Sequence, residues 1–443
     1  MLRSLASVMT SASKRVPIPS RGVDYRGKVV LAPMVRSGEC PSRLLALKYG
    51  ADLVWGPETV DRAMIGTTRK FNPVTKTIDF TRYSNNGQKD HVPDPSQRES
   101  VIYRLHPELE GGKLIYQIGT ASPELAVQAA LIVAPDVAGI DVNAGCPKPF
   151  STSGGMGAAL LKTPDLLCSI LRALIKEVGE PNNIGISVKI RILDTAEQTR
   201  ALVTQLVQTG ITGLTVHCRT TPMRPRERAI RDQLKMIVEI CHDAGVACLM
   251  NGDVISRDEA ISLAEEYGAD GAMIATAAEA NPSCFRTAAD GGLERWDTVV
   301  GEYMSYCLDV ENRWGNTKYL LGQMMPGRSP KYNLMKQSKS YAEVIEHLGL
   351  TETLGEKAKE VDKRLGMGEA VVGEQKMSKA ERRAKNREQQ ELAERRRAEK
   401  KKSQQANVQK RKAEEAELDD IPHDMKRQTA PGTAQEQASV LAV

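Results

Sequence analysis

The chain lacks the cysteine patterns of a metal module. Its 443 residues include 8 cysteines, but none forms a Cys-x-x-Cys pair and no His/Cys spacing is typical of a metal site. We therefore expect reduced thiols in an intracellular protein and no bound metal. No apolar stretch approaches the ~18 residues needed to cross a bilayer, so no membrane partner is expected. No G-x-G-x-x-G follows an apolar run, which argues against a Rossmann dinucleotide domain. Aromatic residues make up only 4%.

Net charge is also nearly absent at +5, but this sum conceals an asymmetry. Residues 376–412 contain 15 Lys and Arg against 5 Asp and Glu, so this segment carries +10 and the rest of the chain −5. We call residues 376–412 the basic arm. Such an arm suits contact with nucleic acid, a solvated helix or a nuclear localisation signal, and charge alone does not separate these.

Hydrophobic residues reach 41%, enough for a sizeable core, and they gather in eight short runs without clean alternation. Runs of this kind are typical of parallel strands buried on both faces. The runs are 28–33, 52–56, 114–119, 139–143, 186–191, 213–217, 247–251 and 271–275.

Helical patterns separate most of these runs, for example at 122–134, 163–178 and 256–268. Eight strand–helix units in ~250 residues predict a TIM (β/α)8 barrel of the α/β class. The excursion from about 67 to 112 is expected to elaborate the barrel after its second strand. We predict four parts, namely a flexible leader (1–26), the barrel (27–292), a small all-α domain (293–367) and a basic, polar tail (368–443) that is disordered or helical.

Polar or small residues recur where the predicted strands end, which is where a barrel of this kind carries its chemistry. Each alone suits a satisfied residue at the barrel rim, but six polar ends on six strands favour a site. After the last two strands, the NGD segment at 251–253 and the small residues from 275 suit a phosphate pocket. A Lys and a His on adjacent strands suit the polar edge of a flavin. FMN carries a single phosphate, so it fits this pocket better than FAD. The residues concerned are Pro33, Met34, Gln117, Asn143, Cys146, Lys189, Arg191, His217, Asn251, Gly252, Asp253, Ala275 and Thr276.

Several motifs resemble the tRNA-dihydrouridine synthases over roughly residues 27–350. They are LAPMVR (31–36), YQIGT (116–120), DVNAGCPKPFSTSGGMGAALL (141–161), VKIR (188–191), TVHCRT (215–220) and NGD (251–253). The N-x-G-C-P motif with its glycine-rich continuation, together with GNTKYLLGQM (315–324), is similar to the eukaryotic cytosolic type that acts on uridine-20 of the tRNA D-loop.

The resemblance implies roles for individual residues. Cys146 matches the proton donor, and Asn143, Lys189 and Arg191 match residues that contact the target uridine. NADPH or NADH is implied as the reductant and tRNA as the partner, with the protein a monomer. Positions that would hold FMN are Pro33, Met34, Val35, Gln117, Lys189, His217, Asn251, Gly252, Asp253, Ala275 and Thr276.

Two departures from the family pattern stand out. Thr276 occupies a position where the family usually has Arg, so one phosphate-binding charge is missing. Animal relatives carry a double-stranded-RNA-binding domain after the helical domain, and here the basic arm stands in its place. The implied location is cytoplasmic or nuclear, while the acid-free start of the chain also suits a mitochondrial transit peptide.

Two other functions stay open at this point. One is a barrel flavoenzyme that reduces or oxidises a free pyrimidine, like dihydroorotate dehydrogenase, although a small substrate needs neither a helical domain nor a basic arm. The other is a non-catalytic RNA-binding protein that keeps the barrel as a scaffold, against which the intact Cys146, Lys189 and His217 argue.

Overall fold

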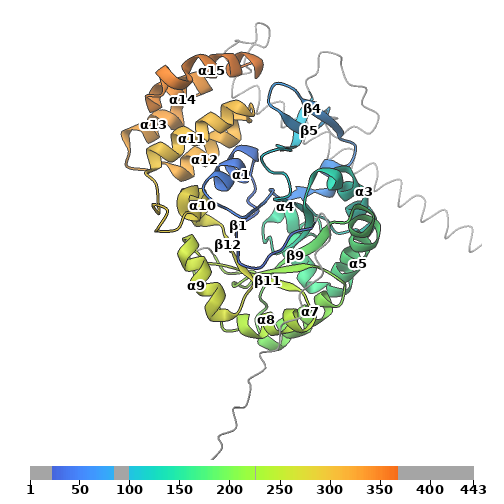
Figure 1. Ribbon diagram of the computed structural model, residues 1–443. Helices are drawn as coiled ribbons and strands as arrows, with labels where there is room; N and C mark the ends of the chain where they lie inside the picture. The colour runs from blue at the N-terminus through green and yellow to red at the C-terminus, as the bar shows by residue number, and fades with distance from the viewer. Residues whose placement is uncertain (1–21, 84–98, 225, 368–443) are drawn as a thin grey trace, which may run out of the picture. The chain divides into compact units, whose positions relative to one another are not determined.

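A computed structural model of the chain describes residues 22–83, 99–224 and 226–367. Its centre is a closed barrel of eight parallel strands (Figure 1). The strands pair in the order β1-β12-β11-β10-β9-β8-β7-β2, and β2 pairs again with β7 to close the ring. They are β1 (Lys28–Leu31), β2 (Leu53–Trp55), β7 (Leu114–Gly119), β8 (Gly139–Ala144), β9 (Gly185–Arg191), β10 (Gly213–His217), β11 (Ala247–Asn251) and β12 (Gly271–Ile274). All eight coincide with the predicted runs, so the predicted barrel is confirmed.

Alternate side chains of each strand face the inside of the barrel, as the period of two requires. Part of the barrel interior is apolar, and Tyr25 packs there in the cluster that includes Trp55, Leu249 and Met273. The opposite faces, such as Val188 and Val216, join a larger core beneath the surrounding helices. Both faces are therefore buried, which explains the unbroken apolar runs.

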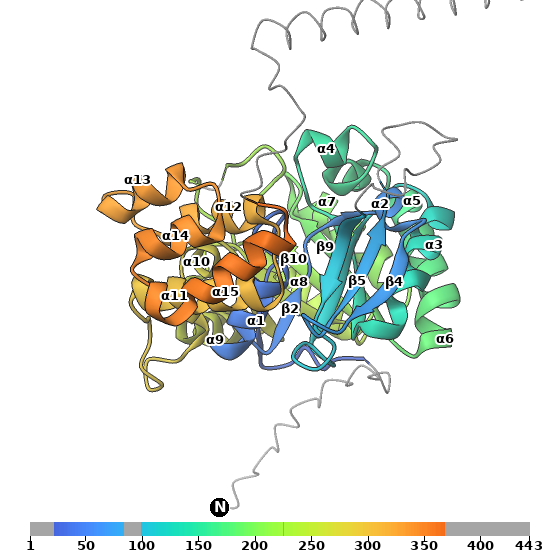
Figure 2. The ribbon, with the colours of Figure 1, turned by 90° about the horizontal axis from the view of Figure 1, so that it is seen from above.

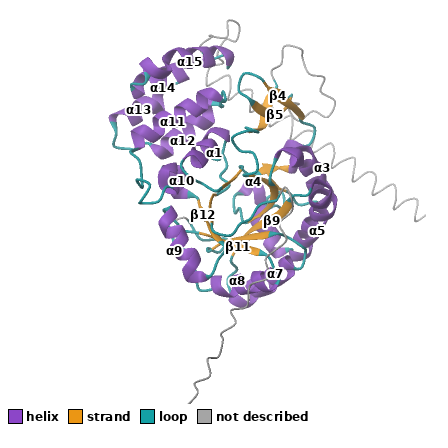
Figure 3. Cartoon of the chain, in the orientation of Figure 1, coloured by secondary structure: helices purple, strands orange, loops and turns teal. Residues whose placement is uncertain are grey.

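The helices around the barrel follow the predicted patterns (Figure 3). Ser122 caps α3 and Ser256 caps α9, each hydroxyl accepting a hydrogen bond from the backbone N–H three residues later. The predicted 163–178 helix is present but not uniform, because α5 passes directly into a π-helical turn at Ile175–Gly179 and then into α6. The helices are α3 (Pro123–Val133), α5 (Pro164–Leu174), α6 (Glu180–Asn182), α7 (Ala196–Val207), α8 (Leu234–Asp243), α9 (Arg257–Tyr267) and, after β1, α1 (Cys40–Lys48).

The excursion after β2 carries an antiparallel sheet of its own (Figure 2). The segment after β2 contains β3 (Thr59–Val60), α2 (Asp61–Met64), β4 (Thr68–Asn72), β5 (Thr77–Arg82) and β6 (Ser100–Leu105), and the antiparallel sheet is formed by β4, β5 and β6. The short β3 pairs with the end of β7 rather than with this sheet. Consequently, the segment just before β3 is held beside the mouth of the barrel.

The C-terminal part of the described chain is all helical, as predicted. Its hydrophobic core is continuous with that of the barrel, and the Asn316 amide donates to the Glu39 carboxylate at 2.8 Å. The helices are α11 (Trp296–Asp309), α12 (Trp314–Met324), α13 (Pro330–Gln337), α14 (Tyr341–Leu348) and α15 (Thr351–Arg364), while α10 (Thr276–Ala280) follows β12 within the range predicted for the barrel. A domain boundary at 292/293 stays a prediction. Most of the predicted leader and the whole tail with its basic arm lie outside the described residues. Within the described ranges, no helix is long and apolar enough to cross a membrane.

Candidate active site

The polar side chains predicted at the strand ends share the inside of the barrel. Register places Asn143 beside Lys189, and His217 between Arg191 and Asn251. Each lies an even number of residues from an interior position of its own strand, so all five face inward at the carboxyl-terminal end. The barrel thus brings together residues that are up to 108 positions apart, from Asn143 to Asn251.

Lys189 and Asn251 meet across the interior. The ammonium of Lys189 donates to Asn251 Oδ1 at 3.0 Å, and Asn251 Nδ2 donates to the Met273 carbonyl at 2.9 Å. Burial, and then the nearby Arg191, lower the pKa of Lys189 to about 8. A cation held at this position is well suited to interact with a ligand that gains negative charge.

Asp141 is a buried acid that the sequence analysis did not single out. Its carboxylate accepts hydrogen bonds from Gln117 Nε2 at 2.8 Å and from Ser187 Oγ at 2.7 Å. Burial raises the pKa of Asp141 to about 6, against the opposing effect of its hydrogen bonds and of Lys189. The signal was present, because Asp141 precedes Asn143 by two residues and therefore shares its face. Gln117, predicted to hold FMN, is oriented by this acid.

A cavity of about 420 Å³ opens where β9 to β12 end. Gly252 has φ +120°, and a Cβ there would lie 3.3 Å from the His217 ring, so this turn needs glycine. Small side chains on the α10 side leave room for a planar group and its phosphate. The predicted FMN residues that line the cavity are His217, Asn251, Gly252, Asp253, Ala275 and Thr276, and Arg191 lines it as well. The donor set and the space fit FMN.

His217 and Asp253 are tied together by Arg219. Arg219 Nη1 lies 3.1 Å from His217 Nε2, and the same guanidinium pairs with the Asp253 carboxylate. Because a guanidinium only donates, Nε2 must accept and the imidazole is neutral. Burial, followed by Lys189, Arg191 and Arg219, lowers the pKa of His217 to about 2. The Asp253 side chain is therefore committed to Arg219 and to the Ala229 N–H (2.7 Å).

Pro33, Met34 and Val35 lie in the loop after β1, next to the end of β12. The Ala32 N–H donates to the Ile274 carbonyl at 2.9 Å, and Ser37 in the same loop donates to Glu279 of α10 at 2.6 Å. This loop therefore borders the junction between β12 and α10. Thr276 is exposed at that junction and lines the cavity.

Cys146 lies in the loop between β8 and α4 (Pro149–Thr152). Asn143 Oδ1 accepts from the N–H groups of Gly145 (2.9 Å) and Cys146 (3.1 Å), which fixes the turn that carries the thiol. Cys146 is partly exposed, whereas each of the other seven cysteines is buried. The carbonyl of Cys146 also accepts from Ala158 N–H at 2.9 Å. This hydrogen bond closes the loop that runs from Cys146 through the glycine-rich segment to Ala158.

Arg191 connects the Cys146 loop to the loop after β10. Its Nε donates to the Gly145 carbonyl at 2.8 Å and its Nη1 to the Thr220 carbonyl at 3.0 Å. Lys189 and Arg191 therefore point to one side of β9, as predicted, and both act electrostatically on Cys146. A partly exposed thiol at the mouth of a barrel can exchange a proton with a bound ligand.

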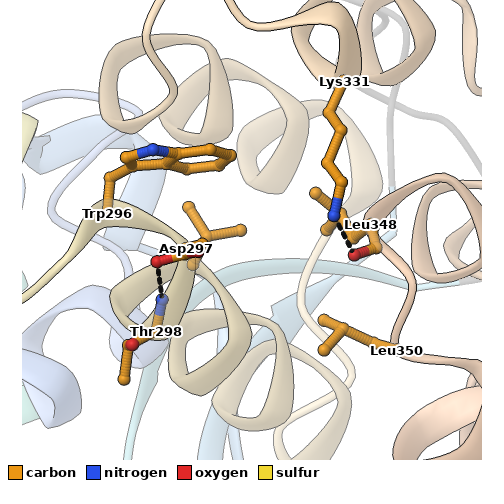
Figure 4. Close-up of a pocket in the computed structure, with 7 residues that line it drawn as sticks. Trp296, Asp297, Thr298, Lys331, Leu348 and Leu350 are labelled. Carbon is orange, nitrogen blue, oxygen red and sulfur yellow. Dashed lines mark hydrogen bonds between the residues drawn. The ribbon is translucent and has the colours of Figure 1, made fainter.

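A second cavity, of about 290 Å³, lies among the C-terminal helices (Figure 4). Trp296 of α11 lies on one side of it and Lys331 of α13 on the other, where the ammonium donates to the Leu348 carbonyl at 2.7 Å. This cavity contains no residue of the predicted site. Among the described residues, no group of His, Cys, Asp and Glu could hold a metal ion.

Comparison with known proteins shows the family to which the chain belongs. Residues 30–364 match the sequence model of the family "Dihydrouridine synthase (Dus)". A "tRNA-dihydrouridine(20) synthase [NAD(P)+]" of Schizosaccharomyces pombe is 50% identical over 327 residues, covering 73% of this chain and 65% of the relative. The Saccharomyces cerevisiae protein of the same name is 46% identical, covering 73% of this chain and 83% of that one. A mouse "tRNA-dihydrouridine(20a/20b) synthase [NAD(P)+]-like" protein is 30% identical over 64% of this chain and 76% of its own length. The chain belongs to the dihydrouridine synthase family.

Proposed function

We propose that the protein is a tRNA-dihydrouridine(20) synthase, which uses FMN and NADPH or NADH to reduce the C5–C6 bond of a uridine in the D-loop. The observation that carries the proposal is Cys146, held by Asn143 beside the cations of β9 at the barrel mouth. The names of the two yeast relatives support position 20, because both exceed in identity the relative named for positions 20a and 20b.

FMN, when bound, supplies a hydride to C6 of the uracil. The residues that would hold it are those of the cavity and its borders, with Asn251 and Gly252 at the turn, Thr276 at the phosphate and Lys189 at the ring. Gln117 and the loop at 33–35 would complete this set. The neutral His217 offers a hydrogen bond without a second positive charge.

The proton for C5 would come from Cys146. Burial raises the pKa of this thiol, which keeps it protonated at neutral pH and therefore able to act as an acid. The S–H bond breaks, its electron pair stays on sulfur, and the new C–H bond forms at C5. Arg191 would contact the uracil carbonyl oxygens while its hydrogen bonds to Gly145 and Thr220 keep it in place. Reduction of a base inside a folded tRNA requires that the base leave its stack.

In this proposal the partner is tRNA, and the helices α11–α15 and the basic arm bind it. This division is supported by the positions of the predicted site residues, which lie in the barrel strands, the segments after them and α10, whereas none lies in α11–α15. We further propose a monomer in the cytoplasm or nucleus.

The test uses purified full-length protein, NADPH and tRNA from a strain without the native enzyme for position 20. We expect a yellow protein that releases FMN on denaturation and forms dihydrouridine at position 20, measured by mass spectrometry of nuclease fragments. Reduction of free uridine nucleotides instead of tRNA would identify the pyrimidine oxidoreductase. A colourless protein that binds tRNA and leaves it unmodified would identify the non-catalytic RNA-binding protein.

A further inference from the structure

Glu58 is an acid beside the Cys146 loop that no part of the proposed mechanism uses. It lies between β2 and β3, in the segment that β3 holds against the end of β7. Its Oε1 accepts from the hydroxyl of Ser151 in α4 at 2.9 Å. Its Oε2 is buried and accepts no standard hydrogen bond from the part of the chain that the structure describes. Glu58 thus has one oriented oxygen and one that is free to face a neighbour.

Two glycines make room for this arrangement. A Cβ at Gly119, at the end of β7, would come within 2.5 Å of Glu58 Oε1. A Cβ at Gly157, where φ is +58°, would contact Ser151 Oγ and approach the Cys146 carbonyl to 2.6 Å. Each glycine therefore lets a side chain or loop close onto the same place, although Gly119 ends β7 and Gly157 follows α4. The close fit of Glu58 with Ser151 and Cys146 thus joins the segment before β3, the end of β7 and the loop that contains α4.

The charges around Cys146 act in opposite directions. Burial is the main cause of its raised pKa, and Glu58 raises that pKa further, while a Lys148 backbone hydrogen bond and Ser151 lower it. Cys146 also interacts electrostatically with Lys189 and Arg191 of β9, and cations favour a thiolate. Burial raises the pKa of Glu58 as well, against its contacts with Ser151, Asn143 and Cys146. Without a nearby carboxylate, the two cations would act on this cysteine without an opposing charge.

We propose that Glu58 is a positioning residue for Cys146. Ser151 orients the Glu58 carboxylate, and this carboxylate keeps Cys146 a thiol, despite the cations Lys189 and Arg191, until a base is bound. The inference rests on the proposed role of Cys146 as proton donor. In the balanced step, the thiol proton passes to C5 and the S–H electron pair remains on sulfur. The resulting thiolate lies beside the carboxylate, which favours its return to thiol with a proton from water.

The experiment compares the purified wild-type holoenzyme with Glu58→Gln and with the control Glu239→Gln, which changes an exposed glutamate of α8. Iodoacetamide labelling of Cys146 is followed by mass spectrometry from pH 6.5 to 9.5, because only the thiolate reacts. In Glu58→Gln the labelling rate at pH 7.5 is expected to rise about three- to tenfold. This is the rise in thiolate that follows when removal of one neighbouring negative charge lowers the pKa of Cys146 by about half a unit to one unit. The control should match the wild type.

Activity gives a second readout. The alkaline limb of the kcat–pH profile reports loss of the thiol, so it should move to lower pH in Glu58→Gln, with flavin content unchanged. Glu58→Asp retains the charge, and it should label more slowly than Glu58→Gln. It also serves as the test variant if the Gln protein does not fold, in which case wild-type-like labelling is expected from it.

Labelling of Glu58→Gln at the wild-type rate over the whole pH range would overturn the proposal, and so would equal labelling of the Gln and Asp variants. The proposed function fails separately. If Cys146→Ala still formed dihydrouridine, Cys146 would not be the proton donor, whereas a shifted labelling profile in Glu58→Gln would still report the effect of the carboxylate on the thiol.

Discussion

Lys189 of β9 and Asn251 of β11 hydrogen-bond to each other at 3.0 Å although β10 separates their strands. Only the curvature of a closed barrel brings side chains from second-neighbour strands into this contact. The pair joins the part of the site next to Cys146 to the cavity proposed for FMN. Loss of either side chain should therefore lower FMN binding more than it changes the position of Cys146.

Lys189→Ala is expected to lower FMN content as well as turnover, because it removes the cation beside the ring and leaves Asn251 Oδ1 without its donor. His217→Ala should do the same. The measurement is flavin absorbance per chain after denaturation, alongside dihydrouridine formation. Lys176→Ala, which changes an exposed lysine of the π-helical turn, is the matched control. Full FMN content and full turnover in Lys189→Ala would show that the ring lies elsewhere.

The neutral state of His217 predicts a dependence of stability on pH. Its pKa is about 2 in the folded chain and about 6.5 in an unfolded one. Between these values the unfolded chain binds a proton that the folded chain does not, so stability falls as the pH drops below about 6.5. His217→Gln removes this loss while keeping an acceptor for Arg219. Its melting temperature should therefore decrease less between pH 7.5 and 5.5 than that of the wild type, and an equal decrease would contradict the neutral imidazole.

Sequence periodicity located the eight strands and placed the polar strand ends on one side, because buried parallel strands and their inward alternation follow from local patterns. Glu58 and Asp141 were not singled out for different reasons. Asp141 sits within an apolar strand and differs from a core residue only by its charge. Glu58 reaches Cys146 because β3 pairs with β7, a contact between segments that no local pattern specifies. The antiparallel sheet from β4 to β6 was located as an excursion but not as strands.

Gly157→Ala should impair catalysis with little effect on the flavin. The positive φ and the contacts of an added Cβ with Ser151 and Cys146 require the loop to move. We expect at least a tenfold lower turnover, with normal FMN content, from single-turnover assays on tRNA; a loop shift of about 1 Å is sufficient for such a loss. Gly154→Ala is the control, since its added Cβ would meet mainly the flexible end of Met156. Wild-type turnover in Gly157→Ala would mean that the fit of this loop does not matter.

Cys146→Ala should retain FMN and tRNA affinity while dihydrouridine formation falls by about 10²- to 10⁴-fold, the usual contribution of a positioned acid. Tritium release or mass spectrometry of the tRNA measures the product, and flavin absorbance confirms an intact cavity. Cys168→Ala, in the buried face of α5, is the control for loss of a thiol. It should keep normal turnover even if it melts at a lower temperature. Equal activity of the two variants would remove Cys146 from the mechanism.

The basic arm gives a prediction about tRNA affinity that rests on charge alone. Residues 376–412 carry +10, whereas the rest of the chain carries −5 and would by itself repel a polyanion. Each phosphate that the arm neutralises adds binding that weakens steeply with salt. Truncation after residue 373 should therefore leave FMN content and saturated turnover unchanged, raise the KM for tRNA and flatten its dependence on salt. The two proteins are compared by filter binding at 50 to 200 mM salt. If the truncated chain bound tRNA as tightly as the full chain at low salt, with the same slope, the arm would serve localisation and the barrel mouth with the C-terminal helices would supply the whole affinity.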